Sequence, residues 1–126
     1  MSKQAASTNE APSAPAFLSQ ALTSTGLVFV SGQIHTLPDN ALVGDTTEEK
    51  VAQIMKNIEA ILKSANASLD DIVKVVIYVT DMAVMPELNK VYPTYFTEPY
   101  PVREAVCVKA LPLGAEIEIS VIAARG

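Results

Sequence analysis

The stretch Ile72-Val73-Lys74-Val75-Val76-Ile77-Tyr78-Val79-Thr80 carries the strongest strand signal in the chain and decides the class of fold. Its residues alternate between two faces, as in any strand, but both faces are largely apolar. Such a strand belongs inside a sheet that is covered on both sides. Helices are expected on one side, and another element or a second subunit on the other. The two faces are Val73, Val75, Ile77 and Val79 on one, and Ile72, Lys74, Val76 and Tyr78 on the other.

Two amphipathic helices are predicted to cover the sheet. The first follows Thr46, because Thr46 and Glu49 have the spacing of a capping box, in which each side chain binds a free backbone N–H at the helix start. Asn66 is expected to stop it. The second begins at Asp81, and Pro93 predicts a kink or an early end because proline inside a helix costs roughly 3 kcal/mol. Apolar residues at three- and four-residue steps mark the buried stripes, which are Val51, Ile54, Met55, Ile58, Ile61 and Leu62 in the first helix and Leu88, Val91, Tyr92, Tyr95 and Phe96 in the second.

Three further strands complete the expected fold. Residues 27–30 form the first, which ends in the bend of residues 31–33. Residues 102–109 and 116–124 are predicted to pair as a hairpin around the turn at residues 111–114. The order strand, helix, strand, helix, strand, strand predicts an α+β fold with two helices on one face of a mixed sheet.

The composition restricts the possible functions. Residues 1–15 are rich in Ala, Ser and Pro and are expected as a flexible tail, and residues 16–126 as one domain. The net charge is −5 and the basic residues are scattered, which argues against nucleic acid and anionic membranes as partners. No stretch approaches the roughly 20 apolar residues of a spanning helix. The sequence predicts a cytoplasmic protein and leaves a mitochondrial location open.

Two charged residues near the C-terminus are candidates for chemistry. Arg103 begins a strand of Ala, Val and Cys, where a guanidinium needs a partner or a wet cleft. One interpretation is that Arg103 forms a structural salt bridge or is a charge on an edge strand. The other is that it binds a carboxylate, whose two oxygens fit the planar guanidinium. Glu118 is either an ordinary exposed acid or a desolvated group with a raised pKa that exchanges protons with water. A regular hairpin would place the two side chains roughly 13 Å apart, with a small substrate between them.

Other reactive side chains give weaker signals. His35 is the only histidine and has no cysteine or carboxylate at ligand spacing, so it is expected at the surface and no metal site is predicted. Cys107 lacks a basic neighbour upstream and is expected in a core or cleft position rather than as a nucleophile. No phosphate loop or dinucleotide-binding glycine pattern is present. The sequence therefore predicts neither a metal nor a cofactor.

Several segments of the chain resemble a known family. They are Ser31-Gly32-Gln33-Ile34, Asn89-Lys90-Val91-Tyr92, Tyr95-Phe96, Pro101-Val102-Arg103-Glu104-Ala105-Val106, Ala110-Leu111-Pro112-Leu113-Gly114-Ala115 and Ile117-Glu118-Ile119. Over residues 16–124 they resemble the RidA/YjgF family of reactive-intermediate deaminases. The resemblance implies a chorismate-mutase-like fold, a homotrimer with active sites between subunits, and hydrolysis of 2-aminoacrylate or 2-aminocrotonate, the enamine forms of 2-iminopropanoate and 2-iminobutanoate, to a 2-keto acid and ammonia.

The resemblance also implies a role for individual residues. Arg103 holds the substrate carboxylate, Glu118 positions the hydrolytic water, Gly32 offers a backbone contact, and Ser31 and Asn89 line the cleft. The reaction needs little more, because imines hydrolyse in water and general acid-base help of roughly 10² to 10⁴ suffices without metal or cofactor.

One departure from the family pattern keeps other functions open. The family often has a tyrosine before its Ser-Gln-Ala, and here Leu18 takes that place. The alternative is a regulatory module of the same fold that binds a small carboxylate without turnover. RNA cleavage has been proposed for relatives, but the acidic balance and the absence of a basic, aromatic-lined patch argue against it. The sequence does not decide which imine is the physiological substrate.

Overall fold

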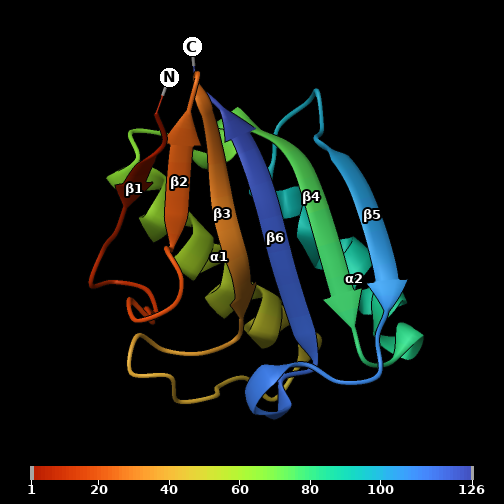
Figure 1. Ribbon diagram of the computed structural model, residues 1–126. Coiled ribbons are helices and arrows are strands. Elements are labelled where there is room, and N and C mark those ends of the chain that lie inside the picture. Colours follow the sequence, from red (N-terminus) through yellow and green to blue (C-terminus); the bar gives the residue numbers. More distant parts are fainter. Residues whose placement is uncertain (1, 126) are drawn as a thin grey trace.

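A computed structural model describes residues 2–125, which form a six-stranded sheet with two helices on one face (Figure 1). The strand order is β1-β2-β3-β6-β4-β5, and only β4 and β5 are parallel. The predicted α+β class, with its mixed sheet and its two helices on one face, is confirmed. The elements are β1 Gln4–Ala6, β2 Ala21–Ser24, β3 Leu27–Ile34, α1 Thr47–Ser64, η1 Leu69–Asp71, β4 Ile72–Val79, η2 Met82–Val84, α2 Met85–Val91, η3 Tyr92–Tyr95, β5 Val102–Cys107, η4 Pro112–Gly114 and β6 Ile117–Ala124.

The helix boundaries follow the local signals in the sequence. Thr46 Oγ1 accepts a hydrogen bond from the Glu49 N–H at 3.1 Å, and Glu49 Oε1 accepts one from the Thr46 N–H at 3.1 Å. α1 ends before Asn66, whose φ of 60° is left-handed and stops the helix. Asp81 caps the short 3₁₀ turn η2, from which α2 continues. Pro93 lies in the 3₁₀ turn η3, so α2 ends early, as the proline predicts.

The predicted hairpin between the last two strands is wrong. β6 lies between β3 and β4, and β5 pairs in parallel with β4 at the edge of the sheet. Side chains of β6 alternate between buried and half-buried, which suits a central strand, whereas those of β5 are almost all exposed. A turn signal shows that two strands are close in sequence, but burial decides which neighbours each strand takes.

Two β-bulges change the faces expected from alternation. β3 does not bend away after Val30 but continues to Ile34, with an irregular register between Val30 and Gln33. In β4 the register shifts between Ile72 and Lys74. As a result Ile72 is buried and Val73 is 45% exposed, opposite to the predicted faces.

The segment expected as a flexible tail is folded onto the sheet. Gln4–Ala6 pairs with β2 as an additional edge strand, and Ala11 is buried. The Gln20 side chain holds this segment, because its Nε2 donates to the Ala11 and Pro12 carbonyls at 3.1 and 2.8 Å. A polar, alanine-rich segment has no strand signal of its own and becomes a strand by pairing with an existing edge.

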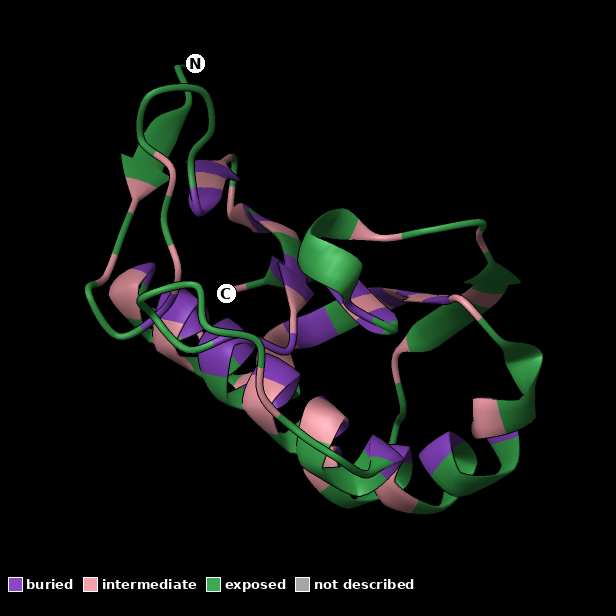
Figure 2. Cartoon of the chain, turned by 90° about the horizontal axis from the view of Figure 1, so that it is seen from below, coloured by how far each residue is buried: buried purple, intermediate pink, exposed green. Residues whose placement is uncertain are grey.

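The core lies between the sheet and the two helices, as the buried segments in Figure 2 show. The opposite face of the sheet has no cover within residues 2–125, and it presents exposed Phe29, Val102 and Val106. Within the described residues, β4 is therefore covered on one face by the helices, and the cover expected on its other face is not present. None of the described helices is both long and apolar enough to cross a membrane.

Candidate functional site

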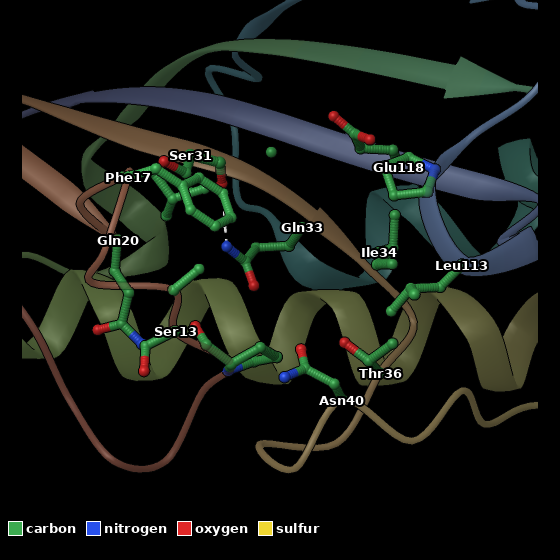
Figure 3. Close-up of a pocket in the computed structure, with 15 residues that line it drawn as sticks. Ser13, Phe17, Gln20, Ser31, Gln33, Ile34, Thr36, Asn40, Leu113 and Glu118 are labelled. Carbon is green, nitrogen blue, oxygen red and sulfur yellow. Dashed lines mark hydrogen bonds between the residues drawn. The ribbon is translucent and has the colours of Figure 1, made fainter.

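A groove of about 310 Å³ opens beside the second half of β3 (Figure 3). It forms there because β2 pairs with β3 only as far as Val30, so the edge beyond it is left to loops. Parts of the segments 12–20 and 31–40 line the groove, together with Pro112, Leu113 and Glu118. The groove thus joins the irregular part of β3 to the start of β6.

The Glu118 carboxylate lies directly against Gly32. A Cβ atom added at Gly32 would be 2.9 Å from Glu118 Cδ and closer still to Oε2. Glu118 pairs with Ile34 across the two strands and is half-buried. Burial raises the pKa of its carboxyl, and no neighbouring charge or hydrogen bond in the described chain offsets that effect. Glu118 is therefore partly desolvated rather than an ordinary exposed acid, and its role in proton exchange stays a prediction.

Arg103 lies on the exposed edge strand β5, outside the groove. Its guanidinium carbon is 5.0 Å from the centroid of the Tyr92 ring, a cation–π geometry. The two ion pairs found within residues 2–125, Lys50–Glu116 and Lys74–Glu104, do not include it. Arg103 therefore forms no structural salt bridge in the described chain. Its exposed place on β5 fits the edge-strand charge that the sequence left open, and its role as a carboxylate clamp stays a prediction.

One chain holds Arg103 and Glu118 on opposite faces of the sheet. Arg103 pairs with Val75 of β4, and Glu118 pairs with Tyr78 of the same strand. The two residues are thus three positions apart along the strands and two strands apart across the sheet, which puts their backbones roughly 14 Å from each other. Arg103 reaches toward the helix layer through Tyr92, whereas Glu118 alternates with buried Ile117 and lies on the open face. The arrangement expected from a hairpin is thus replaced by two separate half-sites.

The other predicted site residues divide in the same way. Ser31 lines the groove with Gly32, and its hydroxyl donates to the Ser19 carbonyl at 2.6 Å. Leu18, at the position of the family tyrosine, also lines it. Asn89 lies exposed on α2 and is not part of the groove wall.

The expectation that His35 is a surface residue is wrong. It is 1% exposed, and its Nδ1 lies 2.8 Å from the Val43 carbonyl while its Nε2 lies 3.0 Å from the Glu116 N–H. A carbonyl requires a donor and an N–H requires an acceptor, so the ring is neutral with its proton on Nδ1. His35 thereby ties the loop around Val43 to the chain two residues before Glu118. Its partners are 8 and 81 residues away, which is why no local pattern identifies it.

Cys107 is likewise not where the sequence placed it. The thiol is exposed on the edge strand β5 rather than in the core or the groove. The described residues contain no cluster of three or more His, Cys, Asp or Glu side chains that could hold a metal ion. The groove therefore offers one acid, Glu118, among uncharged side chains.

Comparison with known proteins identifies the family. A family model described as Endoribonuclease L-PSP matches residues 8–125. The chain belongs to this family, the RidA/YjgF family. Among its RidA/YjgF relatives, Protein HMF1 of Saccharomyces cerevisiae is 44% identical over 115 residues, which cover 91% of this chain and 89% of that protein. Reactive Intermediate Deaminase A, chloroplastic, of Arabidopsis thaliana is 38% identical over 122 residues, which cover 96% of this chain and 65% of that protein.

Solved RidA/YjgF structures have the same fold. Yeast Mmf1 superposes with a TM-score of 0.95 at 41% identity, over 99% of this chain and 100% of that chain. E. coli TdcF with bound serine superposes with a TM-score of 0.89 at 30% identity, over 98% of this chain and 99% of that chain. The fold and family expected from the sequence are therefore confirmed.

Proposed function

We propose that the protein hydrolyses enamine and imine forms of 2-amino acids, such as 2-aminoacrylate and 2-aminocrotonate, to 2-keto acids and ammonia. The observation that carries this proposal is the half-buried Glu118 carboxylate, with its raised pKa, held over Gly32 in a groove. The naming of a relative as Reactive Intermediate Deaminase A supports the reaction class. No cofactor is part of the proposal.

In the proposed reaction Glu118 accepts a proton from one water molecule and then donates it to the substrate. The enamine first takes a proton on carbon and releases one from nitrogen, and so becomes the imine. The Glu118 carboxylate accepts a proton from water as the water oxygen bonds to the imine carbon, and the C=N double bond becomes a single bond. Glu118 then returns that proton to the nitrogen, which gives an amino alcohol. The hydroxyl proton next passes through Glu118 to the same nitrogen, the C–N bond breaks, and ammonia leaves as the C–O bond becomes the keto group. A carboxyl with a raised pKa suits both steps because it exchanges protons more readily near neutral pH.

The substrate carboxylate requires a cation, and we assign that role to Arg103 of a neighbouring subunit. Within one chain Arg103 is roughly 14 Å from Glu118 and on the other face of the sheet, so it does not reach the same small molecule. A homotrimer that covers the apolar open face would bring the two half-sites together. Ser31 and the Gly32 backbone would line the side of that site formed by the groove. Asn89 would line the side that the neighbouring subunit forms with its Arg103.

The test adds the purified protein to a serine or threonine dehydratase reaction and measures the lifetime of the released enamine. The wild-type protein is expected to shorten it, Arg103→Ala to abolish the effect, and Glu118→Gln to reduce the turnover by at least about 100-fold. An unchanged enamine lifetime with intact binding of small carboxylates would instead support a non-catalytic module. Cleavage of RNA that survives purification and is lost in Arg103→Ala would support the nuclease that the family description names.

Subunit mixing tests the shared site. Refolding the two inactive variants together in equal amounts should restore about a quarter of the wild-type sites, because such a site needs one intact Arg103 and one intact Glu118 from different chains. No recovery from stable mixed oligomers would refute the shared site. The expected cytoplasmic location stays a proposal, to be checked by fractionation, since one relative is named as mitochondrial.

A further inference from the structure

We propose that His35 is a positioning residue for Glu118 and that protonation of His35 inactivates the site. This inference rests on the proposed function, in which Glu118 acts on the hydrolytic water. His35 itself does not line the groove. It acts through the strand that carries Glu118.

The imidazole of His35 takes over from the backbone where β3 and β6 separate. The regular pairing of these strands ends at Ile34 and Glu118. Beyond Ile34 the chain turns away, since the Thr36 N–H donates back to the Ile34 carbonyl at 2.9 Å. In a continued antiparallel ladder Thr36 would lie opposite Glu116. The Glu116 N–H donates instead to His35 Nε2 at 3.0 Å, so the side chain of His35 extends the connection between the strands.

The two nitrogens of the His35 ring connect two walls of the groove. Nδ1 donates to the Val43 carbonyl at 2.8 Å and so closes the loop of residues 36–43, part of which lines the groove (Figure 3). Nε2 holds Glu116, two residues before Glu118. Because His35 is 1% exposed, neither contact has bulk water as a ready substitute.

A small movement at the start of β6 would displace the acid. On the β4 side the Glu116 carbonyl accepts from the Thr80 N–H at 3.1 Å, and on the β3 side its N–H is held by His35. The Glu118 carboxylate lies so close to Gly32 that an added Cβ would be 2.9 Å from its Cδ. Loss of the His35 contact frees β6 on one side, and a misplacement of about 1 Å costs up to roughly 100-fold in rate.

A second proton on the ring would break one of the two contacts. The neutral ring accepts at Nε2, whereas an imidazolium has a donor on both nitrogens and would turn an N–H toward the Glu116 N–H. The charged groups that face the ring are the Lys50 ammonium of α1 and the Glu116 carboxylate, and these two form an ion pair with each other. Burial is the largest effect on the pKa of His35 and lowers it below the ordinary 6.5, so the ring becomes protonated only in acid.

The ring can be observed directly by NMR, because the chain contains a single histidine. With isotope-labelled protein at neutral pH, the proton should be found on Nδ1 and not on Nε2. The Glu116 amide should exchange slowly with D₂O in the wild type and in His35→Gln, and rapidly in His35→Leu. A proton on Nε2, or a rapidly exchanging Glu116 amide in the wild type, would overturn the proposal whether or not the protein is a deaminase.

The enamine-lifetime assay at neutral pH then tests the effect on Glu118. His35→Leu removes the acceptor and should lower kcat about 10- to 100-fold with little change in KM, because Arg103 stays in place. His35→Gln should stay within about three-fold of the wild type, since an amide also has a donor and an acceptor. Asn57→Leu is the matched control: Asn57 is buried and donates to the Thr36 carbonyl of the same loop at 2.8 Å, but its hydrogen bonds in the described chain do not reach β6.

The pH profile tests the effect of protonation. As the pH falls, kcat/KM of the wild type should drop more steeply than that of His35→Gln, because His35 and Glu118 both take up protons in the wild type and only Glu118 does so in the variant. Parallel profiles would overturn the proposed inactivation. This comparison does not depend on His35→Leu, so it decides the matter even where that variant does not fold.

The outcomes separate this inference from the proposed function. If the wild type is active and His35→Leu loses no more activity than Asn57→Leu, only the positioning role is overturned. If no enamine is hydrolysed, the proposed reaction is wrong, and the pKa of the Glu118 carboxyl measured by carbon NMR takes the place of kcat. That pKa should fall in His35→Leu, where the displaced carboxyl gains water, and not in Asn57→Leu. An unchanged value in His35→Leu would overturn the positioning role as well.

Discussion

A methyl group added at Gly32 should disable the site without unfolding the protein. In Gly32→Ala the new Cβ would lie 2.9 Å from Glu118 Cδ and closer to Oε2, whereas ordinary contacts of a Cβ begin at 3.4 Å. The Glu118 carboxylate must therefore retreat by roughly 0.5 to 1 Å, and a misplacement of about 1 Å costs up to roughly 100-fold in rate. We expect kcat in the enamine-lifetime assay to fall about 10- to 100-fold.

Stability should change little in the same variant. The φ of Gly32 is not left-handed, so alanine fits its backbone, and the clashing atoms are the flexible end of one side chain. The free energy of unfolding should stay within about 1 kcal/mol of the wild type in urea titration. This separates a displaced carboxylate from a damaged fold.

A double-mutant cycle provides the control for this prediction. In a Glu118→Gln background the residual turnover should not fall further when Gly32 is replaced, because the group that the methyl displaces no longer acts as a base. Wild-type kcat in Gly32→Ala would refute the reasoning. An additive loss in the double variant would show that Gly32 acts through something other than Glu118.

Three further predictions concern other parts of the fold. Thr46→Ala should lower the free energy of unfolding by about 1 kcal/mol in thermal denaturation, because it removes half of the capping box of α1, and an unchanged stability would contradict that role. Tyr92→Phe should leave stability unchanged or raise it by up to about 1 kcal/mol, since the buried Tyr92 hydroxyl has no partner in the described chain, and a clear loss would indicate a partner in the assembled protein. Burial lowers the pKa of His35 in the folded protein below its ordinary 6.5. As the pH falls, the unfolded chain therefore takes up the proton first. The stability linked to His35 is complete above about pH 6.5 and is lost as the pH falls toward the pKa of the folded state. Urea titrations between about pH 7 and 5.5 should show this loss in the wild type and a shallower slope in His35→Gln, and equal slopes would argue against a titrating His35.

The features predicted correctly from sequence depend on neighbours within a turn or two of chain. The capping box of Thr46 and Glu49, the left-handed Asn66 and the early helix end near Pro93 are all set by atoms only a few residues apart. Their geometry repeats in any protein with the same local pattern. The family resemblance then located Gly32 and Glu118 and implied their roles, although not why residue 32 is a glycine.

Contacts between distant segments decided the rest. The pairing of β6 with β3 and β4 rather than with β5, and the two bulges that reassign faces, follow from competition for burial across the whole sheet. His35 looked like a loop residue because its partner at Glu116 is 81 positions away. Only the assembled sheet places Glu118 against Gly32 and separates it from Arg103. The sequence pattern of a strand shows which side chains alternate between its faces, but it does not show which strands lie beside it.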